Sequence, residues 1–344
     1  NEGDKTKLDY QLTLDLAGKD ARGGDGASPG NATPRLDHSV TVALERELLD
    51  YANRGAVPEA AENQTRSDEQ SSVVAEYRAS VGRGGFAASA RFDRNELFDD
   101  ASTYRLTGSV GLGGSARLHA SVGTGIANPG FFDLFGFFPG SFVGNPALRP
   151  ERSTSFDVGL EKSFAEGRVR LDATYFRSDL EDEIVPSFDE DTLLSSVRNL
   201  SGRSERRGVE LSLAATPTRR WQVAASYTYT DAEQPDGAAE LRRPRHVASL
   251  DNAFSFADGR ARLNVGIDHS GAQLDSELVF ATPQDRVALP GFTLVGLGAD
   301  WRIDRRWRVY GRIDNLLDEE YEEWFSYRGR GRAFVAGFAM ELAP

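Results

Sequence analysis

Phenylalanine is concentrated in one segment of the chain, where six phenylalanines fall within residues 131–142. Five of them are the candidate ligand-binding residues: Phe131, Phe132, Phe135, Phe137 and Phe138. An exposed cluster of aromatic rings would offer an apolar surface that catches a ligand. The same rings could instead bury one another as the segment folds on itself. The second interpretation is favoured, because the segment lacks the convergent polar groups of a defined pocket.

Carboxylates form three clusters that could ligate a metal ion, at 93–100, 179–183 and 189–191. Calcium takes about six to eight oxygen ligands, so these clusters could order loops around an ion. None has the spacing of a calcium-binding loop with its central glycine and closing glutamate. Solvated charge on surface loops is therefore the preferred interpretation, with contact to lipopolysaccharide through divalent ions as a related one.

The histidines do not combine into a recognisable metal or catalytic site. His246 and His269 are expected diagonally on neighbouring strands, about 7–8 Å apart, which is loose for two ligands of one metal. Aromatic residues at a membrane interface are their favoured role. Ser121 shares a face with His119, but the sequence places no acidic residue beside them to complete a triad. With no nucleophile elbow or phosphate-binding loop either, we predict a protein that is not an enzyme and has no cofactor.

The segments that must position these residues alternate apolar and polar side chains with a period of two, as β-strands do. We identify about fifteen such strands, from Leu8–Leu16 near the start to Phe334–Leu342 at the end. No convincing amphipathic helix is visible. Alternating strands can bury their apolar face against a second layer, or turn it to lipid in a transmembrane barrel.

The lengths of the connections favour the barrel. Short turns such as 82–84 and 257–259 alternate with long polar loops such as 126–152 and 178–203. Short periplasmic turns and long outer loops produce this alternation, which a two-layer sandwich does not require. One connection, 17–37, is long where a short turn is due, and we interpret it as an insertion on the periplasmic side or as a miscounted strand.

The composition agrees with a barrel and argues against other classes. The net charge of -13 argues against nucleic acid as a partner. Without cysteine the chain has no disulfide and no thiolate metal site. No run approaches the roughly 18 to 20 apolar residues of a transmembrane helix. The sequence therefore predicts an all-β chain, a transmembrane antiparallel β-barrel to which the whole of 1–344 belongs, in the outer membrane of a Gram-negative cell.

Four motifs follow one another along the chain: Gly125–Leu134 with its Asn128-Pro129 and Asp133-Leu134 pairs, Gly144-Asn145-Pro146-Ala147-Leu148-Arg149-Pro150-Glu151, Gly208-Val209-Glu210, and the hairpin from Val309 to Tyr321 with Asn315-Leu316-Leu317-Asp318. In this order they resemble the C-terminal barrel of TonB-dependent outer-membrane receptors. That family includes vitamin B12 and ferric-siderophore receptors, and the vitamin B12 type is the nearer match.

The resemblance implies an importer of a scarce, bulky nutrient such as cobalamin or a ferric siderophore. A TonB-type energy-coupling protein would act on a plug inside the barrel. Barrels of this kind have about twenty-two strands, and about fifteen are identified in this sequence. The sequence is therefore expected to lack the first strands of the barrel, and it is also expected to lack the N-terminal plug. Its end, Leu342-Ala343-Pro344, departs from the terminal aromatic residue that the family presents to the barrel assembly machinery. Outer-membrane lipid, lipopolysaccharide and a small-molecule nutrient are the other expected partners.

Three alternatives remain open at this point. A passive porin would have a loop that constricts the lumen and would need no plug. An outer-membrane hydrolase would carry serine, histidine and an acid at one level of the wall. A soluble β-sheet protein would tolerate charge on the apolar face, for example at Phe156, Val158 and Leu160.

Overall fold

The computed structural model describes residues 2–17, 36–55, 57, 59, 60, 63–136, 138, 140–189, 191–276 and 286–341. Most of the connection 17–37, the candidate residue Phe137, the acidic residue Glu190 and the chain end Leu342–Pro344 lie outside the described residues.

Fifteen antiparallel strands form one sheet and follow one another in chain order, which confirms the predicted strand number and fold class. They are β1 Glu2–Ala17, β2 Leu36–Asn53, β3 Gln64–Val81, β4 Gly84–Asn95, β5 Ala101–Gly113, β6 Ala116–Ala127, β7 Glu151–Phe164, β8 Val169–Glu181, β11 Arg203–Thr218, β12 Trp221–Glu233, β13 His246–Phe256, β14 Ala261–Ser270, β17 Phe292–Arg302, β18 Trp307–Asp314 and β21 Ala333–Met340.

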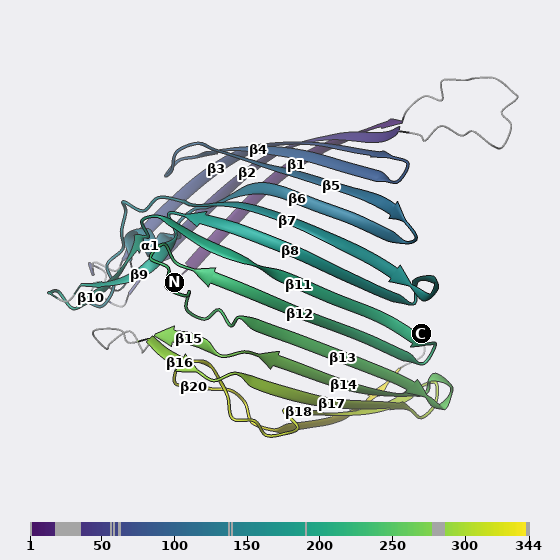
Figure 1. Cartoon of the computed structure of the whole chain (residues 1–344). Helices are drawn as coiled ribbons and strands as arrows, with labels where there is room; N and C mark the ends of the chain where they lie inside the picture. The colour runs from purple at the N-terminus through teal and green to yellow at the C-terminus, as the bar shows by residue number, and fades with distance from the viewer. Residues whose placement is uncertain are drawn as a thin grey trace, which may run out of the picture. The chain divides into compact units, whose positions relative to one another are not determined.

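The chain divides into two compact units. The first comprises Asn1–Leu112, Arg117–Val158 and Ser178–Ser204, and the second comprises Gly113–Ala116, Gly159–Arg177 and Glu205–Pro344. Within each unit the strands run side by side. Apart from the connection between β1 and β2, the longer connections lie at one end and the short turns at the other (Figure 1).

The short turn between β5 and β6 has a backbone conformation that its glycines favour. Gly113 and Gly114 have φ of 89° and 54°, in the left-handed region where glycine has no steric penalty. Short 3-10 turns close two further hairpins, η1 Ala165–Gly167 and η2 Ala257–Gly259. The strands β1 and β2 pair directly, with Ala17 opposite Asp37. The connection 17–37 therefore joins two neighbouring strands of the sheet, and its residues 18–35 lie outside the described residues.

The long connections contain elements that the periodicity did not predict. They are the helix α1 Phe131–Phe135 and the hairpins β9 Ile184–Asp189 with β10 Leu194–Asn199, β15 Gln273–Ser276 with β16 Arg286–Leu289, and β19 Glu322–Trp324 with β20 Tyr327–Arg328. The sequence shows no convincing amphipathic helix, and α1 is the one α-helix among the described residues. Five residues are too few to show a helical period, and the helix start is fixed locally because Gly130 N donates to the Asp133 carboxylate at 3.1 Å.

Each unit leaves its apolar side chains on one exposed face of its strands. Leu8 and Leu44 in the first unit are 72% and 53% exposed, and Leu211 and Phe338 in the second are 44% and 72% exposed. Among the described residues only Leu134, Leu148, Ala232, Ala261 and Leu289 are buried apolar residues. A soluble sheet would bury such a face, so this arrangement fits strands that face lipid.

None of the helices that the described residues form is long and apolar enough to cross a membrane.

Candidate functional site

The phenylalanine-rich segment belongs to the first unit and separates its rings into two groups. Phe131 packs against Tyr51, and Phe135 lies under the Arg66 guanidinium, 4.2 Å from its ring centroid. Phe132 stacks on Phe142 at 4.3 Å between ring centroids. The contacts of Phe131 with Tyr51 and of Phe135 with Arg66 hold the loop on the strands β2 and β3.

The second group remains open to solvent. Phe138 meets Phe132 edge-on at 6.2 Å, and their exposed fractions are 57% and 41%. We call Phe132, Phe138 and Phe142 the aromatic stack. Of the five candidate residues, Phe132 and Phe138 thus present their rings outward, and Phe131 and Phe135 anchor the loop. The aromatic stack is the feature of this end that could hold an apolar ligand.

The hairpin β9–β10 holds the aromatic stack in place. Val143 N donates to Ser195 O at 2.9 Å, and Ser195 N donates to Ser141 O at 3.0 Å, so a parallel β-bridge at Phe142 joins the aromatic stack to the hairpin. Asn199 fastens the base of both loops: its amide donates to Arg149 O at 2.9 Å and Asp182 O at 2.7 Å. The two loops therefore form one braced body that presents the aromatic stack.

The acidic clusters serve mainly as partners within these loops. Asp179 and Glu181 pair with Arg203 at 3.3 and 2.9 Å, and Asp182 pairs with Arg149. No group of three or more histidine, aspartate or glutamate residues in the described ranges could hold a metal ion.

Asp189 shapes the tip of the hairpin β9–β10. Its carboxylate accepts the N–H groups of Asp191 and Thr192 at 2.9 and 3.0 Å. These hydrogen bonds, that of Thr192 first, hold the pKa of Asp189 below its ordinary value. The carboxylate thus stabilises a tight turn of the hairpin.

The two histidines of the second unit lie in the predicted register. Ala248 is opposite His269 and Gly271 N donates to His246 O, which places the histidines diagonally on β13 and β14. His246 Nδ1 lies 2.9 Å from Tyr227 Oη, and His269 Nδ1 lies 2.9 Å from Thr293 Oγ1. Each histidine therefore has a hydroxyl partner on a neighbouring strand.

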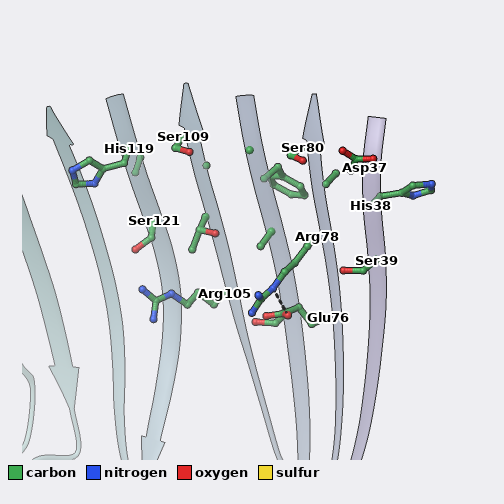
Figure 2. A pocket seen from close by; sticks show the side chains of 18 of the residues that line it. Asp37, His38, Ser39, Glu76, Arg78, Ser80, Arg105, Ser109, His119 and Ser121 are labelled. Atoms are coloured by element: carbon green, nitrogen blue, oxygen red, sulfur yellow. Dashed lines mark ion pairs between the residues drawn. The ribbon is translucent and has the colours of Figure 1, made fainter. Parts of the chain in front are cut away.

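The opposite, polar face of the strands carries the residues that a hydrolase would need. Figure 2 shows His119 and Ser121 on one strand of this face, with Arg105 on the next. Ser121 donates to the Asp157 carboxylate, a partner that the sequence analysis missed. A triad needs histidine between the serine and the acid, because histidine takes the serine proton. Here the Asp157 carboxylate accepts the hydrogen bond of the serine hydroxyl directly. This arrangement does not activate the serine as the nucleophile of a triad.

Ion pairs also lie on the polar face of the first unit. Arg91 pairs with Glu45 at 2.8 Å and with Asp93 at 2.7 Å, and Lys5 pairs with Glu47 at 2.7 Å. A recess of about 960 Å³ lies on this face, lined by Arg78, Arg105 and Ser121 among others (Figure 2). Such a wall fits the hydrophilic interior expected of a barrel.

The second unit has its own centre of loop packing, which the sequence did not reveal. Asp275 is 1% exposed and pairs with Arg242 at 2.7 Å. It also accepts the N–H groups of Ser276 and Phe325, both at 2.8 Å. The Arg242 guanidinium lies 3.8 Å from the Trp324 ring centroid. One carboxylate thus joins three loops, which we call the Asp275 hub.

The pKa of Asp275 reflects two opposing effects. Burial alone would raise it, but the hydrogen bonds from Phe325 and Ser276 and the Arg242 guanidinium outweigh burial and hold the pKa below its ordinary value. The hub is therefore held by an ionised carboxylate at neutral pH.

The last long loop is closed by Asn315. Its amide donates to Glu319 O at 2.9 Å and Arg330 O at 3.2 Å, and its carbonyl accepts Glu319 N at 2.9 Å. Asp318 accepts Arg332 N at 2.8 Å. The motif Asn315-Leu316-Leu317-Asp318 is thus a structural turn that joins the two ends of the loop.

The chain belongs to the TonB-dependent receptor family: the family model described as "TonB dependent receptor-like, beta-barrel" matches residues 3–316. The fold, the strand order and the four ordered motifs agree with this assignment, and the predicted resemblance is confirmed.

Among its relatives are vitamin B12 transporters. The chain is 26% identical over 356 residues to vitamin B12 transporter BtuB of Vibrio vulnificus, with 96% of this chain and 54% of the relative covered. It is also 26% identical over 259 residues to vitamin B12 transporter BtuB of Photobacterium profundum, with 73% of this chain and 39% of the relative covered. The chain therefore spans about half the length, or less, of these curated relatives.

Solved structures of siderophore receptors share the fold. The ferric enterobactin receptor of Pseudomonas aeruginosa, in complex with enterobactin, has a TM-score of 0.75 at 17% identity, and 98% of this chain and 54% of that chain are covered. The ferric-catecholate import receptor Fiu of Escherichia coli K12 has a TM-score of 0.72 at 16% identity, with 98% and 55% covered.

Proposed function

We propose that the chain is the barrel portion of an outer-membrane receptor that imports a scarce, bulky nutrient, of the cobalamin or ferric-siderophore class, by energy-coupled transport. The observation that carries the proposal is the aromatic stack, presented on a braced loop of a TonB-dependent receptor barrel. Exposed, pre-positioned rings bind a large ligand with little loss of conformational entropy.

Several features support import over the alternatives. The polar wall is compatible with a plug or with an open lumen, but a passive porin needs no braced aromatic surface. The serine on the wall lacks the arrangement of a hydrolase. The carboxylates of the described outer loops largely bind arginines and backbone N–H groups, so we propose that the receptor works without a resident cofactor.

The partners follow from this role. A TonB-type protein would supply the energy through a plug, the barrel assembly machinery would insert the strands, and lipopolysaccharide and lipid would surround the apolar face. We propose no role for nucleic acid, since the net charge is -13.

The test replaces the two stacked rings. In the full-length receptor, the double substitution Phe132→Ala and Phe142→Ala is expected to weaken binding of cyanocobalamin or ferric enterobactin by about 5- to 150-fold, since each of the two lost aromatic contacts contributes about 0.5–1.5 kcal/mol. Affinity is measured by titration calorimetry in detergent micelles. Phe156→Ala, on the apolar face of β7, is the matched control. An unchanged affinity of the double variant for a probe that the receptor binds would contradict the assignment.

A further inference from the structure

Two recesses lie on the polar face of the first unit, at the foot of the aromatic loop. The larger, about 380 Å³, is lined by Arg91, Asp93 and Asn95 among others. The smaller, about 270 Å³, is lined by Asp68 and by Phe131 of the aromatic loop. Gln70 and Asn128 line both recesses, and their side chains are joined only by a long hydrogen bond of 3.4 Å.

The smaller recess contains a carboxylate that the described residues satisfy only in part. Asp68 is 9% exposed, and its Oδ2 accepts a hydrogen bond from Asn95 at 2.9 Å. Its Oδ1 is buried, and no hydrogen-bond partner for it exists among the described residues. A buried acceptor without a hydrogen-bond partner destabilises the fold. Such an atom therefore indicates that a further group donates a hydrogen bond to it.

A second unsatisfied atom lies two residues away on the same face of β3. Arg66 donates through Nη2 to Gln64 Oε1 at 2.9 Å and rests on Phe135, but its Nε is buried with no partner among the described residues. Side chains two residues apart on one strand face are separated by about 7 Å. One small polar group can therefore span the Arg66 donor and the Asp68 acceptor.

The chemistry of the two atoms restricts that group. It must donate to a carboxylate oxygen and accept from a guanidinium N–H at the same time. A bare cation cannot accept, and a deprotonated acid cannot donate. Other carboxylates nearby already have cations: Glu47 pairs with Lys5 at 2.7 Å, and Asp93 pairs with Arg91 at 2.7 Å. A primary carboxamide meets both requirements, because its N–H group donates and its carbonyl oxygen accepts. A single hydroxyl oxygen cannot reach two atoms about 7 Å apart.

We infer that Asp68 and Arg66 form a polar subsite that binds a carboxamide group of the imported nutrient, next to the loop whose aromatic stack holds the apolar part. The inference rests on the proposed function, because it deepens the same binding site. It assigns specificity to the wall of the first unit: nutrients rich in amides are preferred over those that present only carboxylates.

The first test needs no knowledge of the nutrient. Crystals of the full-length receptor are soaked in acetamide, and matched crystals in acetate at the same concentration. We expect acetamide between Asp68 Oδ1 and Arg66 Nε, no acetate there, and no acetamide in the Asp68→Asn variant. The Asp68→Asn variant keeps its amide oxygen as the acceptor for Asn95, but an NH2 group, which is a donor, replaces the other carboxylate oxygen. Only water at this position in every soak would overturn the inference.

The second test separates the subsite from the proposed function. Asp68→Asn is expected to weaken cyanocobalamin binding about tenfold, whereas Asp300→Asn, on the polar face of the second unit, leaves it unchanged. Tight binding of cyanocobalamin that Asp68→Asn does not weaken would contradict the subsite and leave the import proposal standing. Specific binding of acetamide by a receptor that takes neither cyanocobalamin nor ferric enterobactin would support the subsite and contradict the nutrient class.

Discussion

Replacing Leu213 with arginine is expected to destabilise the barrel by about 2–4 kcal/mol, the cost of arginine on a lipid face near the bilayer midplane. Leu213 pairs with Ala225, which lies midway between Trp221 and Tyr229 on β12. Those two aromatic residues mark the expected membrane interfaces. Leu213 is therefore the position on this strand at which a charge is farthest from both headgroup regions.

Its neighbour Ser212 is the matched control. Ser212 pairs with Ser226 on the opposite, polar face, so Ser212→Arg is expected to change the free energy of unfolding by less than about 1 kcal/mol. Both variants of the full-length receptor are folded into phospholipid vesicles and unfolded with guanidinium. Equal stability of Leu213→Arg and Ser212→Arg would show that this face does not meet lipid.

Replacing Asp275 with alanine is expected to open the three loops of the Asp275 hub. The change leaves the N–H groups of Ser276 and Phe325 without their acceptor and removes the partner of Arg242. Arg242 is 41% exposed, which reduces the loss from the ion pair. We expect a local destabilisation of about 2–3 kcal/mol. Amide exchange at Phe325 and Ser276, followed by mass spectrometry, should become roughly 30- to 150-fold faster.

Asp304→Ala supplies the control for that experiment. Asp304 also accepts two backbone N–H groups, from Arg306 and Trp307 at 2.7 and 2.9 Å, but it does so in an exposed turn. We expect a much smaller change there. Unchanged exchange at Phe325 in Asp275→Ala would contradict the hub.

Acid should reproduce the effect of Asp275→Ala. The pKa of Asp275 in the folded protein is lowered from 3.8, so the carboxylate stabilises the hub fully above that value. The stabilisation is lost as the pH falls through the lower, folded-state pKa. Exchange corrected for its intrinsic pH dependence should be flat from about pH 8 to 5 and rise only below about pH 4. A rise near neutral pH would be inconsistent with a depressed pKa.

The strands could be predicted from the sequence because lipid imposes one rule on every second residue. Every second residue from Leu8 to Leu16 lies on the exposed face and must be apolar. This requirement produces a period of two that can be recognised in the sequence. The position of the turn at 257–260 predicted the register that places His246 and His269 diagonally. The strand number followed from the repetition of this pattern.

The loops could not be predicted in this way, because their contacts join residues that are distant in sequence. Asp275 meets Phe325 across 50 residues, and Asn199 meets Arg149 across 50 residues. The phenylalanine cluster was visible in composition, but the division of its rings depends on the hairpin that pairs with Val143. Asp157 lies 36 residues from Ser121, and only the register of neighbouring strands brings them together.

Uptake measured with and without energy coupling tests the central claim most directly. The full-length receptor is expressed in cells that lack their own receptors, and uptake of radiolabelled cyanocobalamin and of iron-55 enterobactin is followed over time. We predict saturable uptake of one of these probes that stops when the TonB-type protein is deleted or the proton gradient is collapsed. Uptake that rises linearly with concentration and survives both treatments would contradict an importer and identify a passive pore.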